Sequence, residues 1–514
     1  MNFAESAWSL LPPLLALTAA VVTRRVVPSL AIGILAGVIL LGGGDWQASA
    51  QILWQKVSGL VWADGGLNSW NLYIVAFLLL LGMLTSLLSL SGATQAFADW
   101  AIARIQTARG ARLTTVFLGV VIFIDDYFNS LAVGSVSRPI TDKLRTSRAK
   151  LAYLLDSTAA PMCVLMPVSS WGAYIIAVIG GILVSHQITD ISPLHAFVAM
   201  IPMNFYAVFA IGLVIVTAIW PINLGAMKDS ERRALEGDTG RVDASALADE
   251  QEPLANGHLL GLLVPIATLV FATVIGLVVT GAMAVLNAGD KLTALAALEN
   301  TDVGLSLVIG GVIALAVAVM MLLRQRPTVK QLGRSFTLGA ASMKGAIIVL
   351  FFAWCIGSVI SDLKTGTYLA SFVGDSMGTN WLPVLLFVLA GLMAFSTGTS
   401  WGTFGIMLPI AGDMAAATDL VMMLPYLAAV LAGSVFGDHC SPISDTTILS
   451  STGAGCDHIE HVRTQLPYAV LVAIVSAVGY AVLGTSGSVM AGFFAASAVF
   501  TLVVWGLQRG VRDV

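Results

Sequence analysis

Long apolar segments recur along the whole chain and constrain its fold more than any other feature. Each holds roughly 18 or more residues, enough for an α-helix to cross the ~30 Å hydrocarbon core of a bilayer. Charged residues make up 11% of the 514-residue chain, against about 25% in soluble domains. Because no alternating strand pattern is present, the sequence predicts an all-α polytopic membrane protein with about 11 full spans. The clearest spans are Leu72–Leu90, Ala196–Trp220, Leu259–Leu286, Val303–Leu323, Leu466–Leu483 and Met490–Leu507.

One segment interrupts the apolar pattern. Residues 228–257 are rich in acidic side chains, include several basic ones and show no apolar stripe. Such a composition is typical of a solvated linker. We therefore expect a first membrane half (residues 1–227), a cytoplasmic acidic linker (228–257) and a second membrane half (258–514). The net charge of −4 gives no indication of a nucleic-acid partner.

Two basic loops flank a single apolar segment in the first half. Lys and Arg residues in short loops stay on the cytoplasmic side of a membrane. The loops Arg104–Arg112 and Arg138–Lys150 are both basic, yet only Leu113–Ser137 separates them. A simple span would place these loops on opposite sides. We therefore predict that residues 113–137 form a re-entrant hairpin, which enters from the cytoplasm and turns within the polar sequence FIDDYFNS, Phe123–Ser130.

The second half contains a matching segment. Leu382–Leu408 has a similar length and a polar centre, FSTGTSWGTFG. Only Lys364 precedes it, and Asp413 and Asp419 follow it, so its flanks carry little positive charge. These flanks are predicted to be extracytoplasmic. Residues 382–408 would then form a second hairpin that enters from the opposite face.

Short sequence matches follow the two hairpins in the same order. A Pro-Ile pair, then LAYLL or LPYLA, then PVSS or PISD occur in the two halves at nearly constant separation. Together with the opposite sidedness, they indicate an inverted-topology repeat, as in many secondary transporters. A broken span interrupted by Pro, Gly and hydroxyl residues follows each hairpin, at residues 151–184 and 425–452. Helix ends and unwound carbonyls near the bilayer centre attract ions, so these breaks are predicted to line a binding site.

Two longer stretches carry a family resemblance. The sequences IDDYFNSLAVGSVSRPITDKLRTSRAKLAYLLDSTAAP and GSVFGDHCSPISDTTILSSTGAGCDHIEHVRTQLPYA resemble the NhaC family of sodium/proton antiporters, within the wider ion transporter superfamily. The resemblance implies two inverted repeats, each with a re-entrant hairpin and a broken helix, and an elevator-type transport domain. It implies a secondary active transporter, not an enzyme, that exchanges Na⁺ for H⁺ by alternating access in the bacterial inner membrane.

The resemblance also leaves an alternative. Members of the superfamily move amino acids or small carboxylates with sodium, so a sodium-coupled symporter or antiporter of such a solute is the second hypothesis. Both hypotheses give small cations and the lipid bilayer as the expected partners. The second hypothesis adds an organic solute. No resident cofactor or metal is expected beyond the transported Na⁺ and H⁺. A homodimer is also considered.

The candidate ion- and substrate-binding residues are the polar residues of these hairpins and breaks. Asp125 and Asp126 are the strongest candidates, because acidic residues inside a membrane are costly and usually functional. Burial and mutual repulsion favour the protonated form of at least one of them, which would let it exchange H⁺ for Na⁺. Asp156 fits an ion ligand and a helix-break cap equally well. The full set is Asp125, Asp126, Asn129, Ser130, Asp156, Ser169, Ser170, Ser396, Thr397, Thr399, Ser400, Asp438, Ser441, Ser444, Asp445 and Thr446.

Aromatic and histidine residues add further hypotheses. Trp171 and Trp401 lie inside polar breaks and would shape a pocket for an organic solute. Three histidines near two cysteines carry zinc-binding side chains, but their spacing fits no common zinc motif. Histidine titrates near neutral pH, so a pH-sensing role is considered as well. A third hypothesis gives the histidines neither role and places His458 and His461 in a cytoplasmic loop. The residues concerned are His439, Cys440, Cys456, His458 and His461.

Overall fold

The computed structural model describes the chain except residues 1, 2, 4, 24, 64, 94, 95, 97, 98, 100–103, 241–253, 255, 256, 290–292, 294–296, 298, 299, 366, 367, 369–377, 443, 513 and 514. The first half contains η1 (Ala7–Leu10), α1 (Leu11–Thr23), α2 (Val26–Leu41), α3 (Trp46–Gly59), β1 (Trp62–Ala63), β2 (Gly66–Leu67), α4 (Ser69–Leu90), α6 (Ala108–Val121), α7 (Asp126–Lys143), α8 (Arg148–Cys163), α9 (Ser170–Ser185), α10 (Pro193–Met200), η2 (Ile201–Met203), α11 (Phe205–Ile219) and α12 (Met227–Leu235). The second half contains α13 (Leu260–Asn287), α15 (Val303–Leu323), α16 (Val329–Ser342), α17 (Lys344–Asp362), η3 (Thr379–Trp381), α19 (Leu382–Thr397), α20 (Ser400–Thr418), η4 (Leu420–Met422), α21 (Met423–Cys440), α22 (Asp445–Ala454), α23 (His458–Ser486) and α24 (Val489–Arg512). The strands β1 and β2 pair antiparallel.

The described part of the chain is almost entirely helical. It contains 8 helices that are long and apolar enough to cross a membrane, or up to 9 if the bent pair formed by α10–η2 and α11 is one span. Shorter apolar helices accompany them at Ala7–Ala16, Val27–Leu41 and Ser170–Ser185. The predicted class is confirmed: the protein is an all-α polytopic integral membrane protein. The described residues contain fewer full-length spans than predicted, because several apolar segments are divided into shorter helices.

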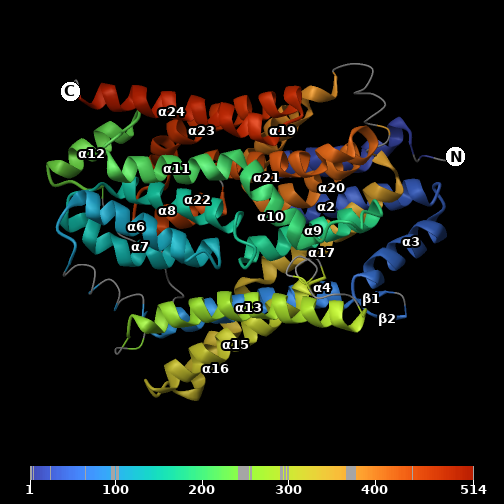
Figure 1. Cartoon of the computed structure of the whole chain (residues 1–514), viewed down its shortest axis with the longest axis horizontal. Helices are drawn as coiled ribbons and strands as arrows, with labels where there is room; N and C mark the ends of the chain where they lie inside the picture. The colour runs from blue at the N-terminus through green and yellow to red at the C-terminus, as the bar shows by residue number, and fades with distance from the viewer. Residues whose placement is uncertain are drawn as a thin grey trace.

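Four helices form a layer of their own. α13 packs on α15, and α4 packs on both α15 and α16. Figure 1 shows this layer below the other helices. The remaining helices form a thicker body whose centre is α8 and α21. Every residue of α8 and nearly every residue of α21 is buried, so these two helices form the core of the body.

Each predicted hairpin is a pair of helices joined by a short turn. In the first, α6 and α7 pack together and are joined by Ile122–Asp125. In the second, α19 and α20 are joined by Gly398 and Thr399. Gly398 has a φ of 70°, in the left-handed region that glycine enters without steric cost. The helices extend beyond the predicted bounds, and the membrane faces from which the hairpins enter stay a prediction.

The two predicted broken spans are interrupted at the matching sequences PVSS and PISD. A break follows α8 and α21, after which α9 and α22 begin. Ser169 accepts a hydrogen bond from the Gly172 N–H at 2.8 Å, and Ser444 accepts one from the Thr447 N–H at 3.3 Å. Each serine therefore caps the amino end of the helix that follows the break. The sequence match reflects the same local structure in both halves.

The broken helices exchange partners between the halves. α22, from the second half, packs on α7 and α8 of the first, whereas α9, from the first half, packs on α17 and α20 of the second. Figure 1 shows α6, α7, α8 and α22 toward one end of the long axis, with α9 and α20 toward the other. This exchange interlocks the two halves and places both hairpin tips on one cavity.

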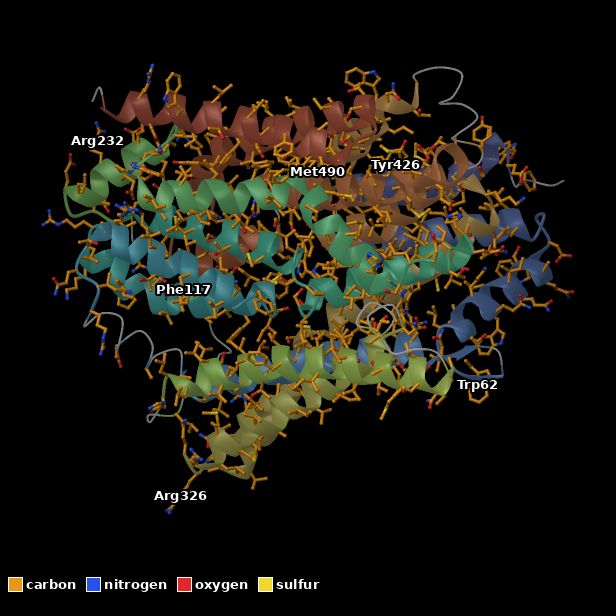
Figure 2. The ribbon with its side chains drawn as sticks, in the orientation of Figure 1. Trp62, Phe117, Arg232, Arg326, Tyr426 and Met490 are labelled. Carbon is orange, nitrogen blue, oxygen red and sulfur yellow. The ribbon has the colours of Figure 1, made fainter. Side chains whose placement is uncertain are left out.

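Basic residues of separate elements lie at the same end of the molecule. Figure 2 shows Arg232 of α12 and Arg326, from the turn between α15 and α16, toward the left, whereas Trp62 lies toward the right. This distribution agrees with the predicted assignment of the basic loops to one side of the membrane.

The first part of the predicted linker is helical. α12 buries Met227 and Ala234 on one face, so the segment has an apolar side that its composition concealed. Glu231 on this helix accepts a hydrogen bond from the Ser147 N–H at 2.8 Å, at the start of α8. The helix is thereby docked on the body. Residues 241–253 of the linker lie outside the described residues.

Candidate functional site

A cavity of about 460 Å³ lies between the two hairpin tips and the helices α2, α16 and α17. Hairpin one contributes two acidic side chains and a tyrosine, and hairpin two contributes its turn. The break before α22 adds a third acid. The remaining lining residues come from α2 and the α16–α17 corner and are apolar or small. The polar and aromatic lining residues are Asp125, Asp126, Tyr127, Thr397, Gly398, Thr399, Trp401 and Asp445.

Asp125 is fixed by hydrogen bonds on both carboxylate oxygens. It precedes α7, and its Oδ1 accepts from the Phe128 N–H at 3.0 Å, which caps the helix. Its Oδ2 accepts from the Ser170 hydroxyl at 3.0 Å. The Ser170 N–H in turn donates to the Ile124 carbonyl at 2.9 Å. Asp125 therefore fastens the start of α9 to the tip of hairpin one.

One carboxylate oxygen of Asp126 makes no well-aligned hydrogen bond to a described residue. Asp126 is the first residue of α7 and is 2% exposed, yet its Oδ2 has no hydrogen-bond partner among the described residues. The Trp171 Nε1 likewise has no well-aligned hydrogen bond in the described part of the chain, and it interacts with the Asp126 carboxylate. A buried polar atom of this kind costs free energy unless it binds a proton, a cation or water. Asp126 lines the cavity and is therefore placed to bind an ion from it.

Asp438 supplies the matching carboxylate of the second half. Its Oδ2 accepts from the Ser400 hydroxyl at 2.8 Å, and its Oδ1 accepts from the Ser444 hydroxyl at 2.6 Å. Ser400 begins α20 and Ser444 caps α22, so the carboxylate joins hairpin two to the break. Asp125 and Ser170 make the corresponding connection in the first half. Asp438 is buried behind the cavity wall and does not line the cavity.

Asp445 connects the two halves at the edge of the cavity. The Tyr127 hydroxyl, from hairpin one, donates to its Oδ2 at 3.1 Å. Ser130 on α7 and Ser450 on α22 form a second connection, with their hydroxyl oxygens 3.1 Å apart. Asp445 is exposed, whereas the other candidate carboxylates are buried. Asp445 is thus the candidate acid that is most open to solvent.

Asn129 serves the hairpin itself. Its Nδ2 donates to the carbonyls of Gly119 and Ile122 at 2.7 and 2.9 Å, and it also lies 3.3 Å from the Thr158 carbonyl. These carbonyls would otherwise be unsatisfied at the end of α6. The Asn129 Oδ1 has no partner among the described residues. Asn129 therefore closes the turn and does not line the cavity.

Most predicted hydroxyl ligands of the second half bond to nearby protein groups. Ser396 and Thr397 each donate to the carbonyl four residues earlier in α19, at 2.8 and 2.9 Å. Ser441 donates to a carbonyl of α19, and Thr446 lies 2.9 Å from the capping serine of α22. Among the predicted hydroxyls, only Thr397 and Thr399 belong to residues that line the cavity.

The two predicted tryptophans pack against each other. The ring centroids of Trp171 and Trp401 are 5.9 Å apart, and the Tyr174 hydroxyl donates to the Trp401 carbonyl at 3.0 Å. Trp401 is partly buried and lines the cavity, whereas Trp171 is 1% exposed and lies behind it. The aromatic cluster joins α9 to α20 and presents one ring to the cavity.

Asp156 lies in a separate, fully buried cluster. Its carboxylate accepts from Ser450 at 3.3 Å, from Thr447 at 3.4 Å and from the Gln465 amide. The cluster also includes His461, which is buried inside α23. The reading of His461 as a loop residue is therefore wrong: α23 begins at His458, and one turn later the side chain faces α8. Asp156 does not share the cavity with the other candidate acids.

Sequence reasoning missed several residues that the structure adds to the site. Tyr127, Thr447, Ser450 and Gln465 all contact a candidate carboxylate. Each lies inside one of the two stretches that carry the family resemblance. Their partners are far away in the sequence, so position within those stretches was the one signal available.

The histidines make separate contacts. His439 bonds through its two ring nitrogens to the Tyr206 hydroxyl and the Asp156 carbonyl, both at 3.1 Å. His458 lies 2.7 Å from the Pro442 carbonyl. Among the side chains that the structure describes, no group of three or more His, Cys, Asp or Glu residues is arranged to hold a metal ion.

A larger cavity, of about 910 Å³, lies elsewhere. It contains the ion pair of Lys56 with Asp362 at 2.6 Å and a contact between His186 and Asp413 at 3.0 Å. It is lined by α3, α4, α9 and α17, and none of the predicted site residues contributes to it. Each acidic side chain of this larger cavity lies next to a basic one, although the Asp413 Oδ2 has no partner among the described residues. The three acids of the smaller cavity have no basic residue beside them in the described lining. The smaller cavity is therefore the candidate ion site.

Comparisons with known proteins agree with this architecture. A protein of Haemophilus influenzae described as uncharacterized is 49% identical over 99% of this chain and 97% of its own length. The malate-2H⁺/Na⁺-lactate antiporter of Bacillus subtilis is 31% identical over 33% of this chain and 36% of its own length. Among solved structures, the Alcanivorax borkumensis YdaH transporter has a TM-score of 0.54 and 15% identity over 86% of this chain and 90% of that chain. The Na⁺/H⁺ antiporter family matches residues 162–485, more than half of the chain. The chain therefore belongs to the Na⁺/H⁺ antiporter family, a family of secondary antiporters.

Proposed function

We propose that this protein exchanges Na⁺ for H⁺ across the bacterial inner membrane by alternating access. The observation that carries the proposal is Asp126, whose carboxylate is buried at a hairpin tip, lines the cavity and keeps one oxygen without a partner among the described residues. A buried carboxylate is stabilised by a proton or by a cation, and each ion excludes the other. Competition for one carboxylate couples the two fluxes in opposite directions.

The surroundings of Asp126 suit a sodium ion. α19 ends at Thr397 on the cavity wall, and the carboxyl end of a helix carries partial negative charge and free carbonyls that attract cations. The Thr399 hydroxyl and the Asp445 carboxylate belong to the same wall. Hard cations prefer such oxygen ligands. Asp125, whose two oxygens are already bonded, would support the tip without binding the ion.

We further propose that transport is of the elevator type. Hydrogen bonds between Tyr127 and Asp445 and between Ser130 and Ser450, both at 3.1 Å, join elements of opposite halves. With the Tyr174 bond to α20, they connect both hairpins and both broken helices into one unit. The helices α4, α13, α15 and α16 form a separate layer beside it. A unit that is connected internally and rests on a separate layer suits rigid-body movement.

An organic solute is the second candidate cargo. The cavity volume of about 460 Å³ lies within the range of small-molecule pockets, roughly 300–1,000 Å³. Trp401 offers an aromatic face, and a relative is named for malate and lactate. However, the described lining residues include three acids and no lysine or arginine. An anionic solute would lack a basic partner there, so the electrostatics favour a cation as cargo.

Proteoliposomes with a lumenal pH dye test the proposal. Addition of Na⁺ alone should change the lumenal pH, and the apparent affinity for Na⁺ should improve as pH rises, because the two ions compete. Li⁺, K⁺, malate, lactate and amino acids are then added in turn, and protein-free liposomes serve as the control. A pH response or substrate uptake that appears only when Na⁺ and an organic solute are both present would contradict exchange of Na⁺ for H⁺ and support the solute carrier.

Cysteine labelling tests the hairpin topology. Gln106 and Lys143 lie on exposed positions at the two ends of hairpin one, and the native cysteines are all buried. Q106C and K143C should both react with an impermeant reagent from the cytoplasmic face. Labelling of the two positions from opposite faces would show that α6 and α7 cross the bilayer and would contradict the re-entrant hairpin.

A further inference from the structure

A second group of titratable side chains lies away from the cavity. Asp156 and His461 are 0% exposed, and neither lines the cavity. They come from α8 and α23, and the His461 Nε2 is 3.4 Å from the Asp156 Oδ2. The mechanism proposed above, which rests on Asp126, makes no use of this pair.

The hydrogen bonds around Asp156 select its charged form. Ser450 donates to Oδ1 at 3.3 Å, and Thr447 and the Gln465 amide point their donors at Oδ2. Donors on both oxygens suit an ionised carboxylate, which only accepts hydrogen bonds. An opposite charge nearby stabilises a buried carboxylate further. In the part of the chain that the structure describes, His461 is the one basic side chain within ion-pair distance of Asp156.

The two buried histidines next to Asp156 differ in their freedom to gain a proton. The His439 Nε2 faces the Asp156 carbonyl, which only accepts, so this nitrogen carries a hydrogen, and in the neutral ring Nδ1 then accepts from the Tyr206 hydroxyl. Neutral His439 is thereby fully bonded. In His461, neither ring nitrogen has a well-aligned hydrogen bond to any described residue. His461 is therefore the group that can bind a proton on the nitrogen that faces Asp156.

The other titratable groups around the pair are few. Asp438 and Cys440 on α21 and Tyr206 on α11 interact electrostatically with Asp156. On α23, Glu460 is already paired with Arg233 of α12. None of these groups is a second cation for Asp156. The Thr447 hydroxyl, which is 3.4 Å from both the Asp156 Oδ2 and the Asp438 carbonyl, connects the pair to the break.

We propose that Asp156 and His461 form a second proton-binding site, which takes up one proton from the solvent as a histidinium–carboxylate ion pair and releases it during the transport cycle. Loss of the proton leaves neutral His461 beside a carboxylate that still accepts hydrogen bonds from Thr447 and Ser450 of α22. This inference rests on the proposed exchange of Na⁺ for H⁺ at Asp126. It makes the exchange electrogenic, because one proton travels with Asp126 and another with the pair.

The first test measures coupling. In proteoliposomes, the Na⁺ gradient that just balances a fixed pH gradient gives the number of protons exchanged per Na⁺. The wild type should exchange two, whereas H461Q should exchange one and still respond to Na⁺. H195Q, which changes an exposed histidine on α10, should keep the wild-type ratio. An unchanged ratio in H461Q would overturn the proposal, since a purely structural histidine alters the rate without altering the ratio.

The second test does not depend on transport. Purified protein in detergent is titrated without buffer between about pH 5 and 9, where histidine changes charge. D156N should bind one proton fewer than the wild type, because its buried histidine then has no carboxylate to keep it charged. H439Q should bind the wild-type number. Equal proton uptake by wild type and D156N would overturn the site. This outcome can be read even if Na⁺ drives no pH change and the function proposed for Asp126 is wrong.

Discussion

The two hairpins have the same shape but different chemistry at their tips. Hairpin one turns at two adjacent acids, and its polar side chains reach α9 and α22. Hairpin two turns at Gly398, and Ser396 and Thr397 bond back to their own helix. Ser400 is the exception, because it reaches Asp438. In the proposed mechanism, hairpin one would supply the charge for ion binding, while hairpin two would supply a neutral wall and one connection to the break.

The largest effect is expected from removing the free carboxylate of hairpin one. D126N keeps the side-chain volume but can neither exchange a proton nor offer a charge, so Na⁺-driven pH changes should fall at least ~100-fold. Folding should be largely retained, because the Asp126 Oδ2 supports no described hydrogen bond. D125N/D126N should be equally inactive. D190N, at an exposed position, is the matched control. Wild-type exchange by D126N would move the coupling site out of hairpin one.

A smaller effect is expected at the carboxylate that hairpin two contacts. In D438N, an amide NH₂ would face one of the two hydroxyl donors, Ser400 or Ser444, that now bond to the acid. The tie between hairpin two and the break would loosen, and the apparent affinity for Na⁺ should weaken roughly 10-fold, since a charge-assisted hydrogen bond contributes ~1.5–3 kcal/mol. The measurement is the Na⁺ concentration for half-maximal dye response. If D438N were as inactive as D126N, transport would require a carboxylate in both halves. The proposed difference between a charged hairpin one and a neutral hairpin two would then be wrong.

Two serines of hairpin two sharpen the contrast. S400A removes one of the two hydroxyl donors to Asp438 and should weaken the apparent affinity for Na⁺ by a factor of about 3–5, less than D438N, because Ser444 still bonds to the acid. S396A removes only a bond within α19 and should leave affinity unchanged. The same dye titration measures both. Equal losses in the two variants would indicate that the hydroxyls of this hairpin act together as ligands.

The smallest effect is expected at the turn of hairpin two. G398A places a side chain at a φ of 70°, which costs about 1 kcal/mol in L-residues. The thermal midpoint of the detergent-purified protein should decrease slightly, while the apparent affinity for Na⁺ stays close to wild type. G378A, at another glycine with positive φ but outside the hairpin, is the control. A large loss of affinity in G398A alone would make the turn itself part of the ion site.

Much of the architecture was accessible from the sequence because it depends on local properties. Apolar length predicts membrane helices, and the paired basic loops predict that the chain returns between residues 113 and 137, where α6 and α7 are joined by a short turn. The matches PVSS and PISD predicted equivalent breaks, since a capping serine is a local requirement of the following helix. The polar tips of both hairpins were likewise predicted, and they line one cavity.

Only the tertiary structure decided which polar residues act together. Asp125 and Asp126 are neighbours in the sequence, yet one is bonded on both oxygens and the other keeps a free oxygen among the described residues. Asp156 is separated from the cavity because α22 packs on α8 and brings Thr447 and Ser450 to it. Such contacts join residues hundreds of positions apart, and helical periodicity and composition carry no information about them. The sequence thus determined the helices, turns and caps, whereas long-range packing determined which carboxylate is free to bind an ion.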